Sequence, residues 1–365
     1  MLTEIVPLYP LYALLFAATG LTEAQISVLF VLWSVSGMVF EVPSGVLADR
    51  FSRRSCLIWA GFIQAAGYLL WIARPDFAGF AIGFLLWSFA GSLTSGAFEA
   101  LLYDGLARAG AAGHYQRLYG RITSVELLAQ LPAAGLATLL FGLGGYPMVG
   151  WASVVVCLGG SLVATGFREP PRCDAAPVPD TDALGYLQVL RSGLAQAARP
   201  LLRGIIFATA FLGGLDAIEE YFPLLAQGWG IPIEAIPLSL LGIPLAGALG
   251  AMFGGRTGQI PATALSVALG AGLVVLAAGN ALGRPASVAG IVVFYGLYRW
   301  VLVIVESRLQ ERITGPDRAT VTSLAALGIE LGGLVLFGLW AVGGLGPVVV
   351  GALAVAVLLP RLLRP

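Results

Sequence analysis

Three acidic residues lie inside a strongly apolar stretch of the sequence, where an ionised side chain needs a partner or a function. Asp216, Glu219 and Glu220 fall within residues 201–227, and at about 3.6 residues per α-helical turn they share one face. A charge inside a membrane span costs roughly 2.5–3.5 kcal/mol on insertion scales. Such acids can bind a proton or a substrate, form a salt bridge in an extracellular gate, or lie at a solvated helix end.

Arg299 falls inside the span at 285–305, about two turns from its cytoplasmic end, and it shares a helical face with Tyr295 and Glu306. Two roles remain open for its guanidinium group. It can pair with an acid of the same half of the chain, for which Asp216 and Glu330 are the candidates, or it can contact an anionic substrate.

The first half of the sequence carries a second set of polar residues within apolar stretches. Glu99 continues a stripe formed by Ser88, Ser92, Ser95 and Tyr103, and Glu126 lies one stretch later. Serine stripes of this kind more often pack helices together than bind ligands. Glu99, Glu126 and Glu330 are therefore secondary candidates for binding a proton, after Asp216.

Several kinds of chemistry are excluded by what the sequence lacks. The single histidine, His114, falls in a loop, and only three cysteines are present, so no metal cage, histidine proton relay or disulfide framework is expected. Without lysine the chain has no phosphate-binding loop, which excludes ATP-driven transport by this chain alone. The 20 basic and 20 acidic residues balance, so nucleic acid is not an expected partner. No cofactor is expected.

Hydrophobic segments long enough to cross a bilayer position these residues. The 365-residue sequence is 58% hydrophobic and only 11% charged. A span needs roughly 20 apolar residues, because about 30 Å of hydrocarbon is crossed at about 1.5 Å per residue. We therefore predict an all-α membrane protein with twelve transmembrane helices in two six-helix pseudo-repeats. The candidate spans lie near residues 5–20, 25–48, 56–73, 77–103, 118–142, 146–167, 201–227, 231–253, 262–282, 285–305, 319–342 and 345–363.

The arginines indicate the orientation of the chain in the membrane. Of the 20 basic residues, seventeen fall in loops on one side, whereas only Arg74 and Arg284 fall in loops on the other. The positive-inside rule then places both termini in the cytoplasm.

The absence of lysine and the 49 glycines indicate a GC-rich genome, from which we expect a bacterial source and the inner membrane.

A polar interval divides the chain into an N-terminal half at 1–167, a cytoplasmic linker at 168–200 and a C-terminal half at 201–365. The linker is expected to be a tether without a regulatory role, and residues 183–199 could form a short amphipathic surface helix. The openings of the two halves share an aromatic-Pro-Leu sequence, followed by a glycine and later by an acidic residue before Ile. Parallel repeats of this kind are common in secondary transporters, with a substrate site between them.

Residues 45–54 read GVLADRFSRR and follow the second predicted span. They resemble the loop signature of the major facilitator superfamily, G-x-x-x-D-R-x-G-R-R/K, with Ser52 in place of the usual glycine. The resemblance extends to the span count, the central loop and the cytoplasmic termini. It implies a cytoplasmic gate, in which arginines of the motif meet acids near the end of the fourth span, here Glu99 and Asp104. The implied motif residues are Gly45, Asp49, Arg50, Arg53 and Arg54. Alternatively, Arg53 and Arg54 only enforce orientation.

The chain departs from drug/proton antiporters of that superfamily. Span 77–103 lacks their arginine, and span 118–142 offers only Pro132 and Gly135 of their Gly-Pro-rich motif. Efflux of the usual multidrug type is therefore not expected. The stretch GAFEALLYDGL, residues 96–106, resembles bacterial efflux-type members, which favours export over uptake.

The resemblance also implies that spans 1, 4, 7 and 10 line a central cavity. We therefore expect a secondary active transporter that exports a small organic molecule by alternating access, coupled to protons. The alternatives are an uptake symporter of the same fold and, from a different class, a non-transporting receptor or a membrane enzyme. No nucleophile with a base is apparent, so an enzyme is not expected. The expected partners are a small-molecule substrate, protons and the lipid bilayer, and we expect a monomer.

Overall fold

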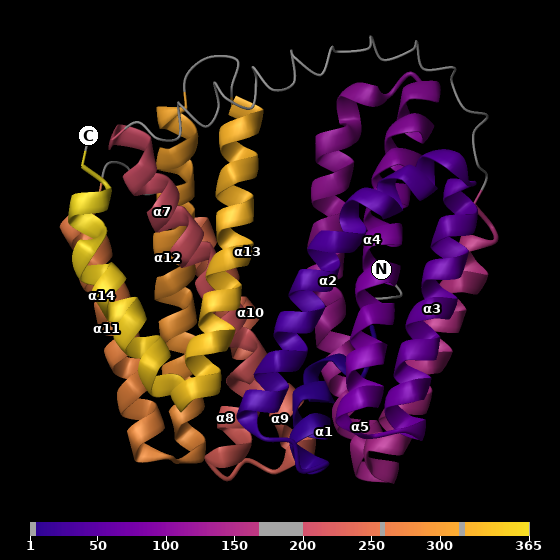
Figure 1. Ribbon diagram of the computed structural model, residues 1–365, viewed down its shortest axis with the longest axis horizontal. Coiled ribbons are helices and arrows are strands. Elements are labelled where there is room, and N and C mark those ends of the chain that lie inside the picture. The colour runs from indigo at the N-terminus through magenta and orange to yellow at the C-terminus, as the bar shows by residue number, and fades with distance from the viewer. Residues whose placement is uncertain (1–4, 168–199, 256–259, 314–317, 365) are drawn as a thin grey trace. The chain divides into compact units, whose positions relative to one another are not determined.

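The computed structural model describes residues 5–167, 200–255, 260–313 and 318–364, and every regular element in these ranges is a helix (Figure 1). Contacts between residues divide the chain into two compact units, Met1–Cys173 with Pro232–Leu241 and Asp174–Ile231 with Gly242–Pro365. Residues 232–241 thus group with the first unit although they come late in the chain. The predicted linker, apart from Pro200, and the surface helix expected at 183–199 lie outside the described residues.

The first unit is built around one long central helix. Its elements are η2 (Tyr9–Leu11), α1 (Tyr12–Ala18), α2 (Glu23–Arg50), α3 (Arg53–Ala73), α4 (Phe77–Arg108), η3 (Ala112–His114) and α5 (Tyr115–Ala164), with the short elements η5 (Ile233–Ala235) and α9 (Ile236–Ser239). The central helix α4 packs against both α2 and α3, and α5 packs along α3.

Polar caps set the starts of α3 and α4. The Ser52 hydroxyl accepts a hydrogen bond from the backbone N–H three residues later. The Asp76 carboxylate accepts from the Gly79 N–H at 2.7 Å and from Nε of Arg74 at 2.8 Å, and these bonds lower the pKa of Asp76. Ser52 therefore fixes the register of α3 and places Arg53 at its first residue.

Aromatic side chains form the core at one end of the first unit. The buried members are Tyr12, Phe16, Phe30, Tyr68, Trp71, Phe80 and Phe84. Phe84 stacks on Trp87 with ring centroids 5.8 Å apart, and the Trp71 indole donates a hydrogen bond to the Phe80 carbonyl at 3.2 Å. Since Tyr12 and Phe16 belong to α1, this cluster holds the short first helix against the unit.

Two glycines separate the fifth and sixth predicted spans. The helix α5 contains 50 residues, far more than the roughly 20 that cross a bilayer. Gly144 and Gly145 depart from helical geometry, and Gly145 has φ +61° and ψ −156°, which side chains with a Cβ rarely adopt. The two predicted spans at 118–142 and 146–167 are therefore distinct segments of α5.

Close contacts between helices hold the second unit together. Its elements are α7 (Pro200–Gly214), η4 (Leu215–Tyr221), α8 (Phe222–Gly228), α10 (Gly242–Gly254), α11 (Ala262–Leu282), η6 (Pro285–Ser287), α12 (Val288–Arg312), α13 (Arg318–Gly343) and α14 (Leu345–Leu362). The helix α12 packs against α10, α11 and α7, and α7 also packs against α13. At Gly250 of α10 a Cβ atom would come 2.1 Å from the Gly296 carbonyl oxygen of α12, so these backbones touch directly.

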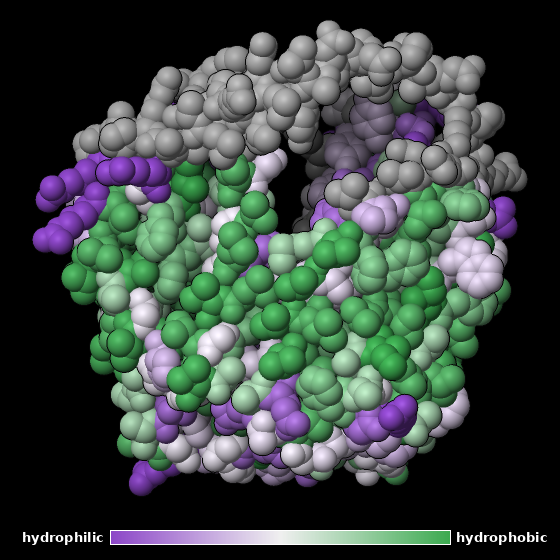
Figure 2. All heavy atoms as spheres, viewed as in Figure 1, coloured by the Kyte–Doolittle hydropathy of each residue, from purple (hydrophilic) through white to green (hydrophobic). Residues whose placement is uncertain are grey.

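By length and hydropathy, nine helices in the described ranges could cross a membrane. The difference from the predicted twelve has three sources: the first helix is short, the fifth and sixth spans merge into α5, and the seventh is broken. Each predicted span nevertheless has a helical counterpart. Figure 2 shows hydrophobic side chains covering the middle of the helices, with hydrophilic residues gathered toward their lower ends in that view.

A continuous α-helix over 201–227 is a wrong prediction. The helix α7 ends at Gly214, Leu215–Tyr221 forms the 3-10 helix η4, and α8 begins at Phe222. Glycines at 213 and 214 weaken the helix, and Pro223 has no N–H to donate to the carbonyl of Glu219. In a 3-10 helix side chains at i and i+3 are eclipsed, so Asp216 and Glu219 share a face while Glu220 is turned about 120° away.

Candidate functional site

Asp216 receives two donors from α12 on the same oxygen atom. The Tyr295 hydroxyl donates to Oδ1 at 3.0 Å, and Nη1 of Arg299 lies 3.5 Å from that oxygen. Tyr295 and Arg299 are four residues apart, so one helical face presents both groups. One turn away, the Tyr298 hydroxyl donates to the Leu212 carbonyl at 2.8 Å and ties α12 to α7. Of the two candidate partners of Arg299, the structure pairs it with Asp216.

This pair is only partly buried. The side chain of Asp216 is 45% exposed and that of Arg299 is 31% exposed, whereas Tyr295 is buried. Ionised groups within membrane spans either pair or face a water-filled cavity, and this pair remains accessible to a small ligand or a proton. The 3.5 Å separation is long for a charge-assisted hydrogen bond, so the guanidinium can exchange partners.

The other acids predicted for the second half lie at separate places. Glu219 is exposed one 3-10 turn after Asp216 and has no salt bridge among the described residues, while Glu220 is half-buried. Glu330 lies exposed on α13. Asp216 is therefore the acid of this group for which the described residues show a salt bridge to an arginine.

The predicted contact between the loop motif and the fourth span is present in the first unit. Arg53 at the start of α3 forms a salt bridge with Asp104 near the end of α4, and its Nη1 also donates to the Ala100 carbonyl at 3.1 Å. The backbones of Gly45, Asp49 and Arg50 belong to α2, and the side chains of Asp49 and Arg50 are not among those that the structure describes. Arg54 is half-buried.

Glu99 makes a different contact from the one expected. The Tyr119 hydroxyl of α5 donates a hydrogen bond to Oε1 of Glu99 at 3.1 Å. Tyr119 also stacks on Tyr115 with ring centroids 5.7 Å apart. Glu126 is half-buried one helical stretch later on α5. Glu99 thus joins α4 to α5 through a tyrosine, and among the described side chains it has no salt bridge to a motif arginine.

The serine stripe mainly packs helices. The Ser88 hydroxyl donates to the Trp33 carbonyl at 2.9 Å, and Ser36 of α2 donates to the Ser88 hydroxyl at 2.7 Å. Ser92 bonds back to the carbonyl of Ser88 within α4. Two of these three bonds join α2 to α4, which agrees with the helix-packing interpretation.

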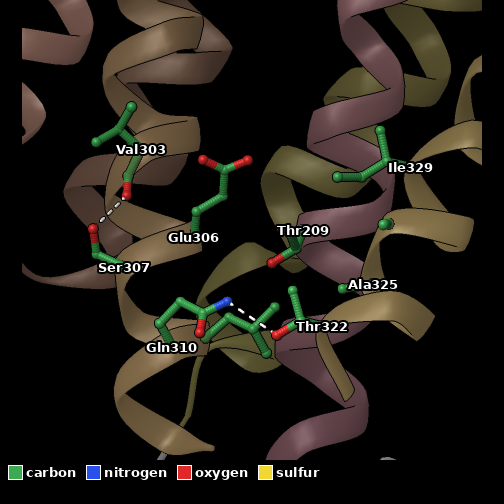
Figure 3. Close-up of a pocket in the computed structure, with 10 residues that line it drawn as sticks. Thr209, Val303, Glu306, Ser307, Gln310, Thr322, Ala325 and Ile329 are labelled. Carbon is green, nitrogen blue, oxygen red and sulfur yellow. Dashed lines mark hydrogen bonds between the residues drawn. The ribbon is translucent and has the colours of Figure 1, made fainter. Parts of the chain in front are cut away.

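A pocket of about 550 Å³ lies among α7, α12 and α13 of the second unit. Figure 3 shows the carboxylate of Glu306 and the side chain of Thr209 directed toward the same space. This pocket is absent from the sequence-based site. Glu306 was noted only for sharing a face with Arg299, and the sole signal for Thr209 was its position about two turns before Asp216.

A metal site is not apparent in the described ranges. No group of three His, Cys, Asp or Glu side chains there is placed to hold a metal ion. Cys56 and Cys157 are buried, and neither forms a disulfide among the described residues.

Comparison with known proteins identifies a family. The profile of the Major Facilitator Superfamily matches residues 3–337. Similar curated relatives include the enterobactin exporter EntS of Salmonella paratyphi A, 27% identical over 342 residues, which covers 86% of this chain and 79% of the relative. EntS of Shigella dysenteriae serotype 1 is also 27% identical over 342 residues, covering 86% of this chain and 78% of that protein.

Solved structures show the same fold. The nucleoside transporter NupG aligns with a TM-score of 0.69 at 14% identity over 99% of this chain and 95% of its own. A D-xylose-proton symporter aligns with a TM-score of 0.70 at 12% identity, covering 100% of this chain and 94% of that one. At such identities these structures support the fold alone. With the family profile spanning nearly the whole sequence, the chain belongs to the Major Facilitator Superfamily and is a membrane transporter rather than an enzyme.

Proposed function

We propose that this transporter exports a small organic molecule by alternating access, driven by protons that return through Asp216. The observation that carries the proposal is the convergence of Tyr295 and Arg299 on one oxygen of Asp216, at a break in the seventh span. Discontinuous membrane helices are typical sites of substrate and ion binding in secondary transporters.

Protonation of Asp216 would change the local charge balance. The ionised carboxylate attracts Arg299, whereas a protonated carboxyl releases the guanidinium to other anionic groups. Loading and release of one proton can therefore rearrange α12 relative to η4 during a cycle. Each proton that returns gains about 2.3 kcal/mol per 100 mV, which concentrates a neutral substrate roughly fiftyfold.

The outward direction is supported by the relatives. Curated proteins that align over 86% of this chain are named as enterobactin exporters. We propose that the chain works as a monomer in the bacterial inner membrane. The side on which its arginines gather supports the placement of both termini in the cytoplasm. Uptake by proton symport is the alternative that the same flux experiment decides.

The test uses the full chain reconstituted in vesicles with an imposed pH gradient. A thermal-shift screen of a metabolite library, with enterobactin included because of the relatives' name, selects the compound whose flux is measured. We expect accumulation to require the gradient in the wild type and to be lost in Asp216→Asn, while the control Glu311→Gln, an exposed acid of α12, keeps it. Wild-type accumulation in Asp216→Asn would refute the coupling role, and Glu99, Glu126 and Glu330 would be tested next. Movement of substrate in the same direction as the protons would establish symport.

A further inference from the structure

The pocket among α7, α12 and α13 has one polar wall and one apolar wall. Its volume of about 550 Å³ lies within the 300–1,000 Å³ that is common for pockets that bind small molecules. The polar members are Thr209, Glu306, Ser307, Gln310 and Thr322, and the apolar members are Val303, Leu309, Ala325, Ala326 and Ile329. A ligand that fills this space would need a polar head and an apolar body.

Glu306 supplies the charge of the polar wall. No salt bridge involves its carboxylate among the described residues, and Arg299, two turns earlier on α12, pairs with Asp216. Figure 3 shows this carboxylate directed away from α12 into the pocket space. An acid in an apolar span with no basic partner is suited to bind a cationic group from outside the chain.

Thr209 supplies an orphaned hydroxyl on the same pocket. Only 3% of its surface is exposed, and its Oγ1 has no hydrogen-bond partner among the described residues. Buried hydroxyl groups are nearly always hydrogen-bonded, so an unsatisfied one at a pocket wall indicates a missing partner.

Gln310 and Thr322 add an amide and a hydroxyl group to the polar wall. Nε2 of Gln310 lies 3.4 Å from Oγ1 of Thr322, at the long end of the hydrogen-bonding range. These groups lie close together at one end of the view in Figure 3, with the Ile329 side chain at the other. Such a wall can accept several N–H donors from a single head group.

We propose that this pocket binds an organic molecule with a primary ammonium head and an apolar body. Its ammonium group donates hydrogen bonds to the carboxylate of Glu306 and to the hydroxyl of Thr209, and its hydrocarbon part packs on Val303, Ala325 and Ile329. The site lies within the second unit and is separate from the Asp216 pair. The inference rests on the proposed function only in naming the substrate class, because the binding itself can be measured without transport.

The binding experiment uses the purified full chain in detergent and isothermal titration at pH 7.5. Three probes share one hydrocarbon body and differ in the head: 4-phenylbutylammonium, 4-phenylbutan-1-ol and 4-phenylbutanoate. We expect the ammonium to bind roughly tenfold or more tightly than either of the others, since only it presents both charge and donors to Glu306. Equal affinity for the ammonium and the alcohol, or no ammonium binding at millimolar concentration, would overturn the proposal.

Variants locate the binding in this pocket. Glu306→Gln keeps the shape and removes the charge, and we expect it to lower ammonium affinity roughly tenfold and to leave the weak alcohol binding unchanged. Thr209→Val removes only the hydroxyl and should lower ammonium affinity by about three- to tenfold, with Thr209→Ser retaining it. Glu311→Gln, an exposed acid next to this region that does not line the pocket, is the control and should bind as the wild type does.

The outcomes separate this site from the transport proposal. Unchanged affinity in a folded Glu306→Gln, checked by gel filtration and thermal unfolding, refutes the site; if that variant is unfolded, Glu306→Asp and Thr209→Val decide. If ammonium binding depends on Glu306 but no pH-driven flux is found in vesicles, the binding site is supported and proton-coupled export is refuted. If another compound shows proton-driven flux and the ammonium probe does not bind, export is supported and the ammonium site is refuted.

Discussion

One carboxylate oxygen of the second unit, Oδ1 of Asp216, contacts both a hydroxyl and a guanidinium group. It accepts from a buried tyrosine at 3.0 Å and lies 3.5 Å from an arginine. The tyrosine bond orients the carboxylate whether or not the arginine is engaged. Of the two donors only the arginine carries a charge, which makes Arg299 the residue to substitute first.

We predict that Arg299→Leu lowers the free energy of unfolding by about 1–3 kcal/mol, between the values for exposed and buried ion pairs, because Asp216 loses its counter-charge. The companion variant Asp216→Asn should remove the penalty when the two are combined, giving a coupling energy above about 0.5 kcal/mol. Thermal unfolding of both single variants and the double variant in one detergent measures this. Strictly additive losses would mean that Arg299 serves another partner.

Arg53 and Asp104 give the corresponding pair of the first unit. Their side chains are 18% and 29% exposed, so the contact is better shielded than that of Asp216 and Arg299. It joins the first residue of α3, which belongs to the motif at 45–54, to the last turns of α4. If the motif closes a cytoplasmic gate, this salt bridge holds α3 and α4 together at the gate.

We predict that Asp104→Asn increases maleimide labelling of a cysteine placed at His114, in η3 after α4, and slows transport while expression stays normal. The reason is that α4 and α3 lose a charge-assisted contact at this end. Glu41→Gln, an exposed acid of α2, serves as the control. Equal labelling and flux in both variants would leave the arginines with an orienting role only.

At the scale of elements, the sequence predicted where the helices lie better than how the seventh one is built. Apolar runs of about 20 residues are visible in any membrane helix, because hydrocarbon requires them. The 3-10 segment Leu215–Tyr221 depends on which carbonyls Pro223 and the glycines leave unpaired, on packing against α13, and on the contacts of Asp216 with α12. The hydrophobicity of the sequence reveals neither the unpaired carbonyls nor the packing, so the prediction placed all three acids on one face of a regular α-helix.

The candidate site was predictable in part for the same reason. Charges in apolar stretches stand out, which brought Asp216 and Arg299 forward from the sequence alone. Thr209 and Thr322 do not stand out, because hydroxyl groups are common in membrane helices and usually bond to their own backbone. Only the packing of α7, α12 and α13 reveals that Thr209 lacks such a bond.

Glycine contacts between helices supply a prediction at this scale. Gly250→Ala would drive a Cβ to 2.1 Å from the Gly296 carbonyl, so α10 and α12 must move apart. We expect a loss of about 1–3 kcal/mol in stability, the usual cost of overpacking. Gly270→Ala on α11 is the matched control, since nothing lies within 4 Å of its added Cβ, and should be neutral or slightly stabilising. Thermal unfolding compares the two variants. Equal melting temperatures would contradict a direct backbone contact between α10 and α12 at Gly250.

For the whole molecule, the number of membrane crossings decides which loops share a side. The loop at η3 and the loop at η6 are separated by α5, by the broken seventh span, by α10 and by α11. If Gly144 and Gly145 divide α5 into two crossings, and α7, η4 and α8 together make one, five crossings separate the loops. They must then lie on opposite sides of the membrane.

We predict that a cysteine at Ala286, in η6, reacts with a membrane-impermeant maleimide in intact spheroplasts, whereas one at His114 reacts only after permeabilisation. Both positions are exposed, and each is placed in a chain whose Cys56, Cys157 and Cys173 are replaced by Ala. The expected sides follow from the positive-inside rule, because Arg108, Arg117 and Arg121 flank His114 while Arg284 alone lies near Ala286. Labelling of both without permeabilisation would mean an even number of crossings, and would show that α5 or the broken seventh span is counted wrongly. The opposite pattern would invert the orientation, and with it the direction in which the pH gradient drives substrate past Asp216.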